Sequence, residues 1–514
     1  MSLQLFDELL GDSRAESLAD HLTKKSKVLS SMGLVVPLQG MLGGRYGLAL
    51  GCIIPLVSFY LIQLRPRKFL PLDPKPAQVK SLEKNEAVEV QPPISARAMS
   101  VISIQETPYY IGGKEMSENG YDSVLNPTGC IEFGTSENKL SLDLLQEWLS
   151  KWGDNLLDLN EAGGYVDFSG LKSLKSVLAR FMGSVMGGRV ELEPSQMVLT
   201  AGATPTLEIL AFSLAQPGEA FLVPSPYYAG FDRDIKWRSQ VELIPVPCSS
   251  DTDFKLTPDV LESTFRRMSR KGIKIRGVLI SNPSNPVGNV LDRAALTSLL
   301  AFTQDKKIHL LVDEIYAACT HEEYAFTSIT EILDTPKSHY NRSYVHIIYG
   351  LSKDLGIAGF RVGVLYSWHK QVLEAASRMA RYCAVSTATQ QLCTSLLSDE
   401  QFMSMFLFEN RRRITKRYRK VVAELNKIGI QSKNSMGGLF CWIDLRHVLA
   451  SPSKDEEMKL WKHLLYKVGL HLTPGTSCWC EEPGWFRLCF ATVDNETLMV
   501  AFLRFQKFMQ NSVY

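Results

Sequence analysis

The sequence predicts an α/β fold, with a doubly wound, mainly parallel sheet in a large domain and a smaller α+β domain assembled from both chain ends. Two observations predict it. Short apolar runs alternate with segments of helical periodicity from residue 197 to residue 383. Several of these runs end in polar side chains, as strands do where open α/β sheets bind ligands. The length of 514 residues leaves room for two or more cores.

The composition excludes several classes of partner and site. Lys plus Arg number 56 and Asp plus Glu number 54, so the net charge of +2 gives no sign of a nucleic-acid partner. The ten cysteines are scattered, and because no Cys or His spacing matches a set of metal ligands, we expect no metal site. Thiols in a chain of this length are typical of a reducing compartment. Small-molecule chemistry is therefore the expected activity.

The N-terminal part predicts a membrane anchor. Residues 1–45 are mostly polar, whereas 46–64 contain an uncharged run that just reaches the length of a bilayer span. Basic residues follow this run at once, so the positive-inside rule places the catalytic part on the cytosolic side of the membrane. A hydrophobic hairpin or an interfacial segment is the alternative for 46–64, with a cytoplasmic protein as the alternative location.

The rest of the chain divides into a linker and two expected domains. Residues 65–106 are rich in proline and cannot pack a core, which predicts a linker. We expect residues 107–160 and 396–514 to form the two parts of the smaller domain, and residues 161–395 to form the large domain.

A lysine follows an apolar run that is expected to be a buried strand. The run covers residues 345–348, and Lys353 comes shortly after it. Burial lowers the pKa of a lysine and frees its lone pair, which makes Lys353 a candidate nucleophile. Eight residues further on, Arg361 offers a planar cation suited to a phosphate, with glycines around it. An amine beside a phosphate anchor indicates pyridoxal 5'-phosphate (PLP). The alternative is a buried lysine paired with Asp354.

This lysine segment resembles that of the fold-type I PLP-dependent transferases, and especially that of the plant 1-aminocyclopropane-1-carboxylate (ACC) synthase-like family. The resemblance extends over roughly residues 107–510. It implies the fold-type I architecture, with residues 161–395 as the PLP-binding domain. It also implies PLP as cofactor, Lys353 as the catalytic residue, Ser352 as a cofactor contact, and a homodimer with the site between its subunits.

A second segment predicts an anion site. Residues 197–200 read as a strand, followed by a tight turn and by a helix with Pro205 at its first position. The first amides of a helix have no internal partner, so together with the Thr204 hydroxyl they can bind an anion. In the resembled family this turn, here with Ala203 and Thr204, holds the cofactor phosphate.

The cofactor ring is assigned four further contacts, each at the end of an expected strand. Tyr228 can stack on a flat ring, although paired tyrosines at a strand end also close protein cores. Asp313 can pair with a protonated ring nitrogen. Asn285 and Tyr316 can donate hydrogen bonds to the ring oxygen, as their counterparts do in the family.

Two residues are assigned to the substrate by the resemblance. Glu137 occupies the position of a family glutamate at the substrate's edge of the site; without the family, the segment reads as an ordinary loop. Arg487, in a Glu-Pro-Gly-Trp-Phe-Arg motif, matches the arginine that binds the α-carboxylate of an amino acid. Taken alone, an arginine in a strand is usually a surface residue.

Three departures from the family pattern bear on the reaction. Phe168 replaces a tyrosine that reaches the cofactor phosphate across the dimer interface. This should weaken the binding of the phosphate, unless Tyr165 or another group takes the place of the tyrosine. Gly350 replaces a serine, and Ala358 replaces a proline. The expected anchor, Phe168 and Gly350 together resemble the plant subgroup of probable aminotransferases with an N-terminal hydrophobic anchor. They favour transfer of an amino group from an acidic or aromatic amino acid to a 2-oxo acid. The alternatives are ACC synthase, a cysteine carbon–sulfur lyase, and a membrane-tethered scaffold without activity.

Overall fold

The computed structural model describes residues 93–511, apart from 153–156, 188–189 and 336–338. The described residues belong to one compact unit, Pro93–Tyr514. The expected polar segment 1–45, the expected anchor 46–64 and most of the expected linker lie outside the described residues. Within the described ranges, no helix is both long enough and apolar enough to cross a membrane.

The larger sheet has seven strands in the order β2-β8-β7-β6-β5-β3-β4. All of its neighbouring strands pair in parallel except at β8, which runs antiparallel to both β2 and β7. The connection from β7 to β8 spans only residues 351–362, which is short for a parallel crossover. The strands are β2 (Met197–Thr200), β3 (Ala220–Ser225), β4 (Glu242–Pro247), β5 (Ile275–Ser281), β6 (His309–Asp313), β7 (Val345–Gly350) and β8 (Gly363–Ser367).

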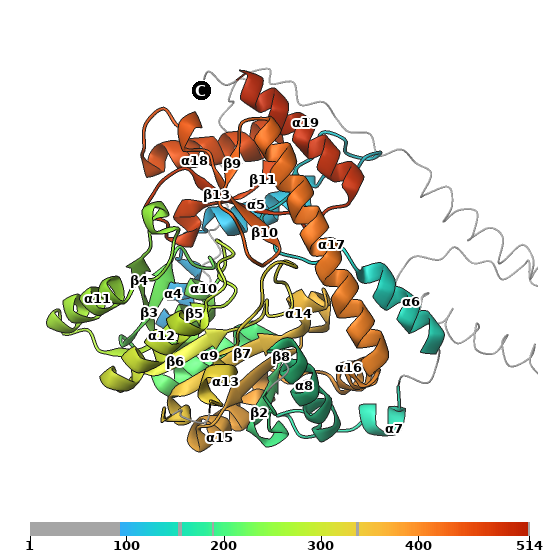
Figure 1. Ribbon diagram of the computed structural model, residues 1–514, viewed down its shortest axis with the longest axis vertical. Helices are drawn as coiled ribbons and strands as arrows, with labels where there is room; N and C mark the ends of the chain where they lie inside the picture. Colours follow the sequence, from blue (N-terminus) through green and yellow to red (C-terminus); the bar gives the residue numbers. More distant parts are fainter. Residues whose placement is uncertain (1–92, 153–156, 188–189, 336–338, 512–514) are drawn as a thin grey trace, which may run out of the picture. The chain divides into compact units, whose positions relative to one another are not determined.

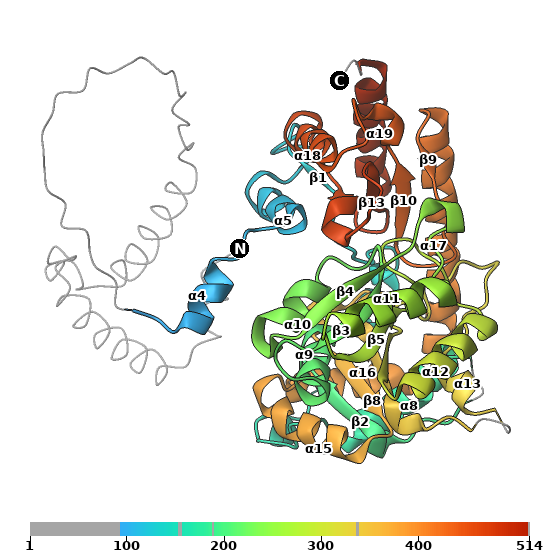
Figure 2. The ribbon, with the colours of Figure 1, turned by 90° about the vertical axis from the view of Figure 1, so that its left-hand side faces the viewer.

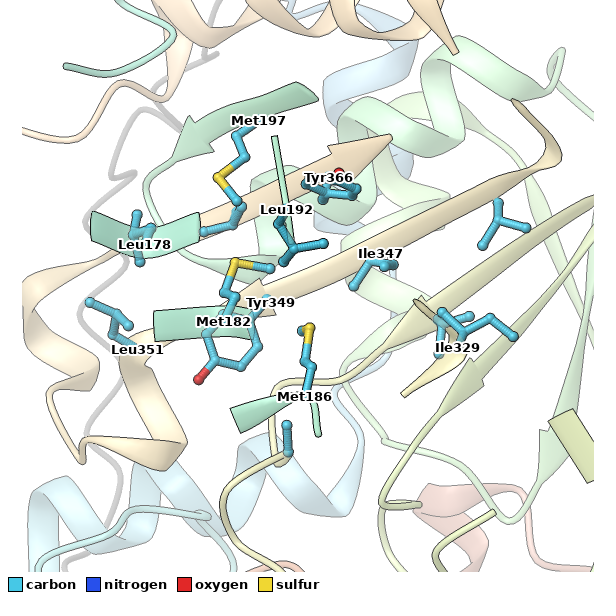
Figure 3. Close-up of a cluster of buried hydrophobic side chains, with 14 of the residues drawn as sticks. Leu178, Met182, Met186, Leu192, Met197, Ile329, Ile347, Tyr349, Leu351 and Tyr366 are labelled. Carbon is cyan, nitrogen blue, oxygen red and sulfur yellow. The ribbon is translucent and has the colours of Figure 1, made fainter. Parts of the chain in front are cut away.

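Helices cover both faces of this sheet, as the doubly wound prediction requires (Figure 1). Because side chains alternate along a strand, Leu310 and Val312 belong to one apolar cluster and Leu311 to another. The first cluster includes side chains of α8 (Lys172–Val185), α11 (Pro258–Arg270), α12 (Arg293–Lys306), α13 (Ile329–Leu333) and α16 (Thr387–Ser398). The second includes α9 (Ala203–Leu214), α10 (Phe231–Ser239) and α15 (Lys370–Met379). Figure 3 shows part of the first cluster, where Leu178 and Met182 of α8 lie near Tyr349 of β7.

A second, antiparallel sheet has four strands in the order β12-β13-β10-β9. It packs into its own apolar core with the C-terminal helices, above the large sheet in the view of Figure 1. Its strands and helices are β9 (Gln431–Ser432), β10 (Phe440–Asp444), β12 (Thr473–Pro474), β13 (Trp485–Cys489), α17 (Glu400–Lys427), α18 (Lys454–His463) and α19 (Asn495–Asn511). Figure 2 shows α17 running alongside both sheets.

Both ends of the described chain meet in this smaller part. The early strand β1 (Ile131–Glu132) pairs in parallel with the late strand β11 (Leu470–His471). Both belong with the second core, which confirms that this part is assembled from the two chain ends. The remaining early helices are α4 (Ala96–Ile102), α5 (Pro108–Asn119), α6 (Leu142–Trp152) and α7 (Leu159–Ala162).

Two local expectations need correction. Helix α9 begins at Ala203 rather than at Pro205, because Gly202 has a φ of 99° and turns the chain two residues earlier. Lys353 lies in a short helix, α14 (Leu351–Asp354), rather than at the end of the strand itself. The first correction brings the free amides of α9 closer to the end of β2, whereas the second places the lysine three residues beyond the end of β7.

Candidate active site

One cavity of about 160 Å³ brings together most of the predicted site residues. It lies where the carboxyl ends of the sheet strands meet the N-terminus of α9, which is where open α/β sheets bind ligands. Nine of the eleven predicted residues line it: Ala203, Thr204, Tyr228, Asn285, Asp313, Tyr316, Ser352, Lys353 and Arg361. Arg487 and Glu137 do not line the cavity.

Among the described residues that line the cavity, Lys353 is the one with a side-chain amine. Its Nζ donates a hydrogen bond to the backbone carbonyl of Ser136, and its own carbonyl accepts one from Asn138 Nδ2 at 3.2 Å. Burial lowers the pKa of Lys353 below its ordinary value. A neutral amine, which is the nucleophilic form, is therefore easier to reach here than in water.

Asp354 does not pair with Lys353, so the alternative reading of the lysine is wrong. Its carboxylate instead accepts hydrogen bonds from Tyr349 at 2.7 Å, Ala318 N at 3.1 Å and Cys319 Sγ at 3.2 Å. Burial raises the pKa of Asp354 to about 7. The carboxyl thus ties α14 to the segment after β6 and leaves the lysine amine facing the cavity.

Asp313 ends β6 and is a buried carboxyl that faces the cavity. It accepts a hydrogen bond from Ile315 N at 3.2 Å. Burial, with the charge of Asp234 adding to it, raises the pKa of Asp313 to about 7. A cationic partner would favour its ionised form, so the site fits a protonated ring nitrogen beside this carboxyl.

The N-terminus of α9 and Arg361 form one end of the cavity. Arg361 donates to Ala358 O at 3.0 Å and to Ala201 O at 2.9 Å, which fixes its guanidinium against the start of the helix. A Cβ at Gly202 would come within 2.2 Å of Arg361 Nη2, so the close approach requires glycine. The free helix amides, the Thr204 hydroxyl and a guanidinium together suit a phosphate.

The ring contacts expected from Tyr316 and Asn285 are held by a hydrogen-bonded network. Tyr316 donates to Ser136 Oγ at 3.0 Å, and Asn285 Oδ1 accepts from Arg487 Nη1 at 2.8 Å. Tyr228 packs edge-to-face on Tyr109, with ring centroids 6.2 Å apart. Polar groups therefore lie on one side of the cavity and an aromatic face on another.

Arg487 is fully buried, contrary to the usual place of an arginine in a strand. Its Nη2 donates to Gly134 O and, at 3.3 Å, contacts Thr473 Oγ1. Its Nε has no hydrogen-bond partner among the described residues. A buried donor without a partner is costly, and a carboxylate is the group that best satisfies a guanidinium. Arg487 thus fits a substrate carboxylate next to Asn285.

Glu137 lies at the edge of the site rather than in it. Its side chain is 40% exposed and forms an ion pair with Lys139 at 3.2 Å. It adjoins Ser136, which lines the cavity, and its negative charge acts on Lys353. The position agrees with a residue at the substrate's edge.

Three cavity residues with polar side chains were missed from the sequence: Tyr109, Ser136 and Asp234. Burial raises the pKa of Asp234 to about 7, and its carboxyl contacts Thr204 at the phosphate end. Asp234 follows Tyr228 in a Phe-Asp-Arg-Asp run, and this run was the available signal. Tyr109 and Ser136 come from parts of the chain with no distinctive motif.

The comparisons with known proteins agree with this geometry. The family model "Aminotransferase class I and II" matches residues 128–505. The chain belongs to this family. As a member, it is a PLP-dependent enzyme, and the residues around its cavity fit the cofactor: an amine, a buried carboxyl, an aromatic face and a phosphate end. Among the residues described, no group of three or more His, Cys, Asp or Glu side chains is placed to hold a metal ion.

Relatives within the aminotransferase class I and II family carry two kinds of name. The chain is 42% identical to "1-aminocyclopropane-1-carboxylate synthase 6" of Oryza sativa subsp. japonica, over 93% of each protein. It is 41% identical to "Probable aminotransferase ACS12" of Arabidopsis thaliana, over 93% of this chain and 99% of the relative.

Solved structures share the fold. The aspartate aminotransferase of Thermus thermophilus matches with a TM-score of 0.65 and 18% identity, over 81% of this chain and all of that one. The aspartate aminotransferase of Rhizobium meliloti matches with a TM-score of 0.66 and 20% identity, over 82% and 99%. The fold-type I architecture is therefore confirmed.

Proposed function

We propose that this protein is an aminotransferase that moves the amino group of an amino acid, acidic or aromatic, to a 2-oxo acid. The observation that carries the proposal is Lys353, the amine in the cavity, with a pKa lowered by burial. Transamination requires a base that takes the proton from the substrate's α-carbon and gives it back to a neighbouring atom. Lys353 is suited to both tasks because it is held by a carbonyl and not by a carboxylate.

The other residues bind and orient the substrate and the cofactor. Arg487 binds the α-carboxylate, and Asn285 keeps the guanidinium in place through their 2.8 Å hydrogen bond. Ala203, Thr204, Ser352 and Arg361 hold the cofactor phosphate. When bound, PLP supplies an electron-withdrawing ring that makes the α-proton acidic.

On the ring side of the cavity, three residues complete the site. With PLP bound, Asp313 would keep the ring nitrogen protonated, and Tyr316, whose hydroxyl otherwise donates to Ser136 Oγ, would donate a hydrogen bond to the ring oxygen. Tyr228 covers the ring face, and its position is fixed by Tyr109. The roles assigned to Asp313, Tyr316 and Tyr228 are therefore compatible with one bound cofactor ring.

Departures from the resembled family pattern support transamination over formation of the cyclopropane ring of ACC. A Cβ at Gly350 would lie 2.9 Å from Val362 O, so the strand β7 packs closely against β8 where the family pattern has a serine. Gly350 therefore offers no hydroxyl at this position. Phe168 offers no hydroxyl either, and its ring instead lies 5.2 Å from the guanidinium carbon of Arg381.

ACC synthase is the second candidate, because several of the similar relatives bear that name. Two reactions separate the candidates: incubation with S-adenosylmethionine, and incubation with aspartate or phenylalanine plus 2-oxoglutarate. We expect glutamate from the second and no ACC from the first. ACC without glutamate would reject the aminotransferase. Release of hydrogen sulfide and pyruvate from cysteine would indicate the carbon–sulfur lyase.

A spectrum separates an enzyme from a scaffold. We expect the purified protein to absorb near 420 nm, and Lys353→Ala to lose this band. Lys139→Ala is the matched control, because Lys139 is an exposed lysine near the site and pairs with Glu137. Absence of the band from the unmodified protein would favour the scaffold.

We also propose that the protein is a homodimer. Aromatic side chains near the Phe168 segment are exposed in the single chain, with Tyr165 at 98% and Tyr382 at 79%. Aromatic residues exposed together are typical of protein interfaces. Light scattering should give twice the mass of one chain; a monomer that is fully active would contradict this.

Residues 46–64 are proposed to tether the protein to a membrane, with the catalytic domain in the cytosol. The support is the sequence alone: the uncharged run and the basic residues after it. The full chain should remain in the membrane pellet after carbonate extraction, whereas a chain that starts at residue 93 should not. Release of both would reject the tether.

A further inference from the structure

A buried Glu–His pair lies behind the segment that contacts the catalytic lysine and the carboxylate-binding arginine. Glu132 ends β1 and His471 ends β11, and the two residues are register partners in that parallel pair. His471 Nδ1 lies 3.0 Å from Glu132 Oε1. The imidazole is fully buried, and neither residue lines the cavity described above.

Glu132 fixes the shape of the segment that follows it. Its Oε1 accepts hydrogen bonds from Gly134 N at 2.5 Å and from Thr135 N at 2.8 Å. Burial alone would raise the pKa of Glu132, but His471 and these amides outweigh burial and lower it. The carboxylate is thus ionised and holds the turn at residues 133–136.

His471 fixes the same segment by packing. Its ring lies so close to Gly134 and Gly112 that a Cβ at either position would come within 2.2 Å of a ring atom. The ring is therefore enclosed between α5 and the turn. A side chain of another shape at 471 would change the position of both Glu132 and the turn.

The turn makes three contacts with the site, through Gly134 and Ser136. Gly134 O accepts a hydrogen bond from Arg487 Nη2. Ser136 O accepts from Lys353 Nζ, and Ser136 Oγ accepts from Tyr316. A shift of the turn therefore moves the hydrogen-bond partners of Lys353, Arg487 and Tyr316 together.

We propose that Glu132 and His471 are positioning residues that set the geometry of Arg487 and Lys353 through the turn at 133–136. This inference rests on the roles given to those two residues in the proposed function. It does not depend on which reaction follows, because amino acids and S-adenosylmethionine share the α-amino and α-carboxylate groups.

Two substitutions at His471 separate the contact with Glu132 from simple packing. His471→Asn keeps a donor at the position of Nδ1, since the Asn Nδ2 is also attached to Cγ. His471→Leu has a similar bulk to imidazole but offers no donor. His321→Leu is the matched control: His321 is also buried, and its ring stacks on Tyr418, away from the turn.

The readout is binding of an α-methyl amino acid, which has the carboxylate but no α-proton, followed by the change in the cofactor spectrum. We expect His471→Leu to weaken binding about tenfold or more, because removal of the imidazole leaves the buried Glu132 carboxylate without its ion-pair partner and frees the turn to shift. We expect His471→Asn to bind within about threefold of the unmodified protein, and His321→Leu to bind as the unmodified protein does. The pH at which the 420 nm band changes should also shift, and it should do so in His471→Leu alone.

The outcomes are distinguishable. If the unmodified protein fails to bind any α-methyl amino acid, the proposed function is rejected. If it binds and His471→Leu binds equally well, the positioning role is rejected. If His471→Asn and His471→Leu weaken binding of the α-methyl amino acid equally, the contact with Glu132 is not the cause. If His321→Leu weakens binding as much as His471→Leu does, the effect comes from a general loss of stability and the positioning role is rejected. Retention of the 420 nm band shows that each variant is folded.

Discussion

Replacement of Arg487 by lysine tests the carboxylate site most directly. The lysine keeps one positive charge but loses the planar fork, whose Nη1 and Nη2 contact Asn285 and Gly134 while Nε is left without a partner among the described residues. Removal of arginine by alanine would instead leave a large void and unpaired buried acceptors. Arg487→Lys is therefore the cleaner change.

The magnitude follows from the hydrogen bonds that a carboxylate would lose. One hydrogen bond to a charged group is worth about 1.5 to 3 kcal/mol, which corresponds to a loss of roughly 10- to 150-fold in kcat/KM. We expect a loss in this range for Arg487→Lys, with the 420 nm band retained because the arginine does not touch the predicted phosphate site.

The assay is kcat/KM for amino-acid donors with 2-oxoglutarate, or for S-adenosylmethionine if that is the substrate. Arg446→Lys is the matched control, since Arg446 is an exposed arginine that bonds Asp444 and Glu482. It should change kcat/KM less than about twofold, as exposed ion pairs contribute little. A folded Arg487→Lys variant with kcat/KM within about threefold of the original would refute the assignment.

Two further predictions concern the cofactor end and a buried carboxyl. Gly202→Ala should weaken PLP affinity more than Gly218→Ala does, because both positions have positive φ but only at 202 does the new Cβ collide with Arg361; equal PLP dissociation constants would contradict this. Glu314 is buried, which raises its pKa to about 8 from an ordinary value of 4.5. The folded state therefore keeps its proton longer than the unfolded state, and the free energy of unfolding should fall as pH rises from 4.5 to about 8, by up to about 1.4 kcal/mol per pH unit from this group. Glu314→Gln should make that fall shallower in denaturant titrations, and an unchanged slope would show that Glu314 does not titrate in this window.

The sequence was informative where function depends on the end of a strand. Asp313 and Asn285 follow runs of apolar residues, and a parallel sheet brings such strand ends to one edge. The phosphate turn before α9 was also visible, because the first amides of any helix are free. Asp234 was not recognised, since a carboxylate beside a phosphate has no motif of its own and depends on burial for its raised pKa.

Other predictions failed or could not be made because they depend on long-range packing. The direction of Asp354 is set by Tyr349 and Cys319, and no spacing in the sequence shows that the carboxyl turns away from Lys353. In α17, Arg411 bonds to the backbone carbonyls of residues 320, 321, 322 and 324, and Arg417 to those of 490 and 493; no local pattern in the sequence shows these contacts.

The fold class, the cofactor and nine residues around the cavity were predictable from the chain, partly from strand ends and a helix N-terminus and partly from the resemblance to a known family. How the cavity is supported is visible only in the folded molecule. Ser136, the Glu132–His471 pair and the buried Arg487 meet only because β1 and β11, from opposite parts of the chain, pair beside one another. Contacts between distant segments arise from packing of the whole core, and no local pattern of residues encodes them.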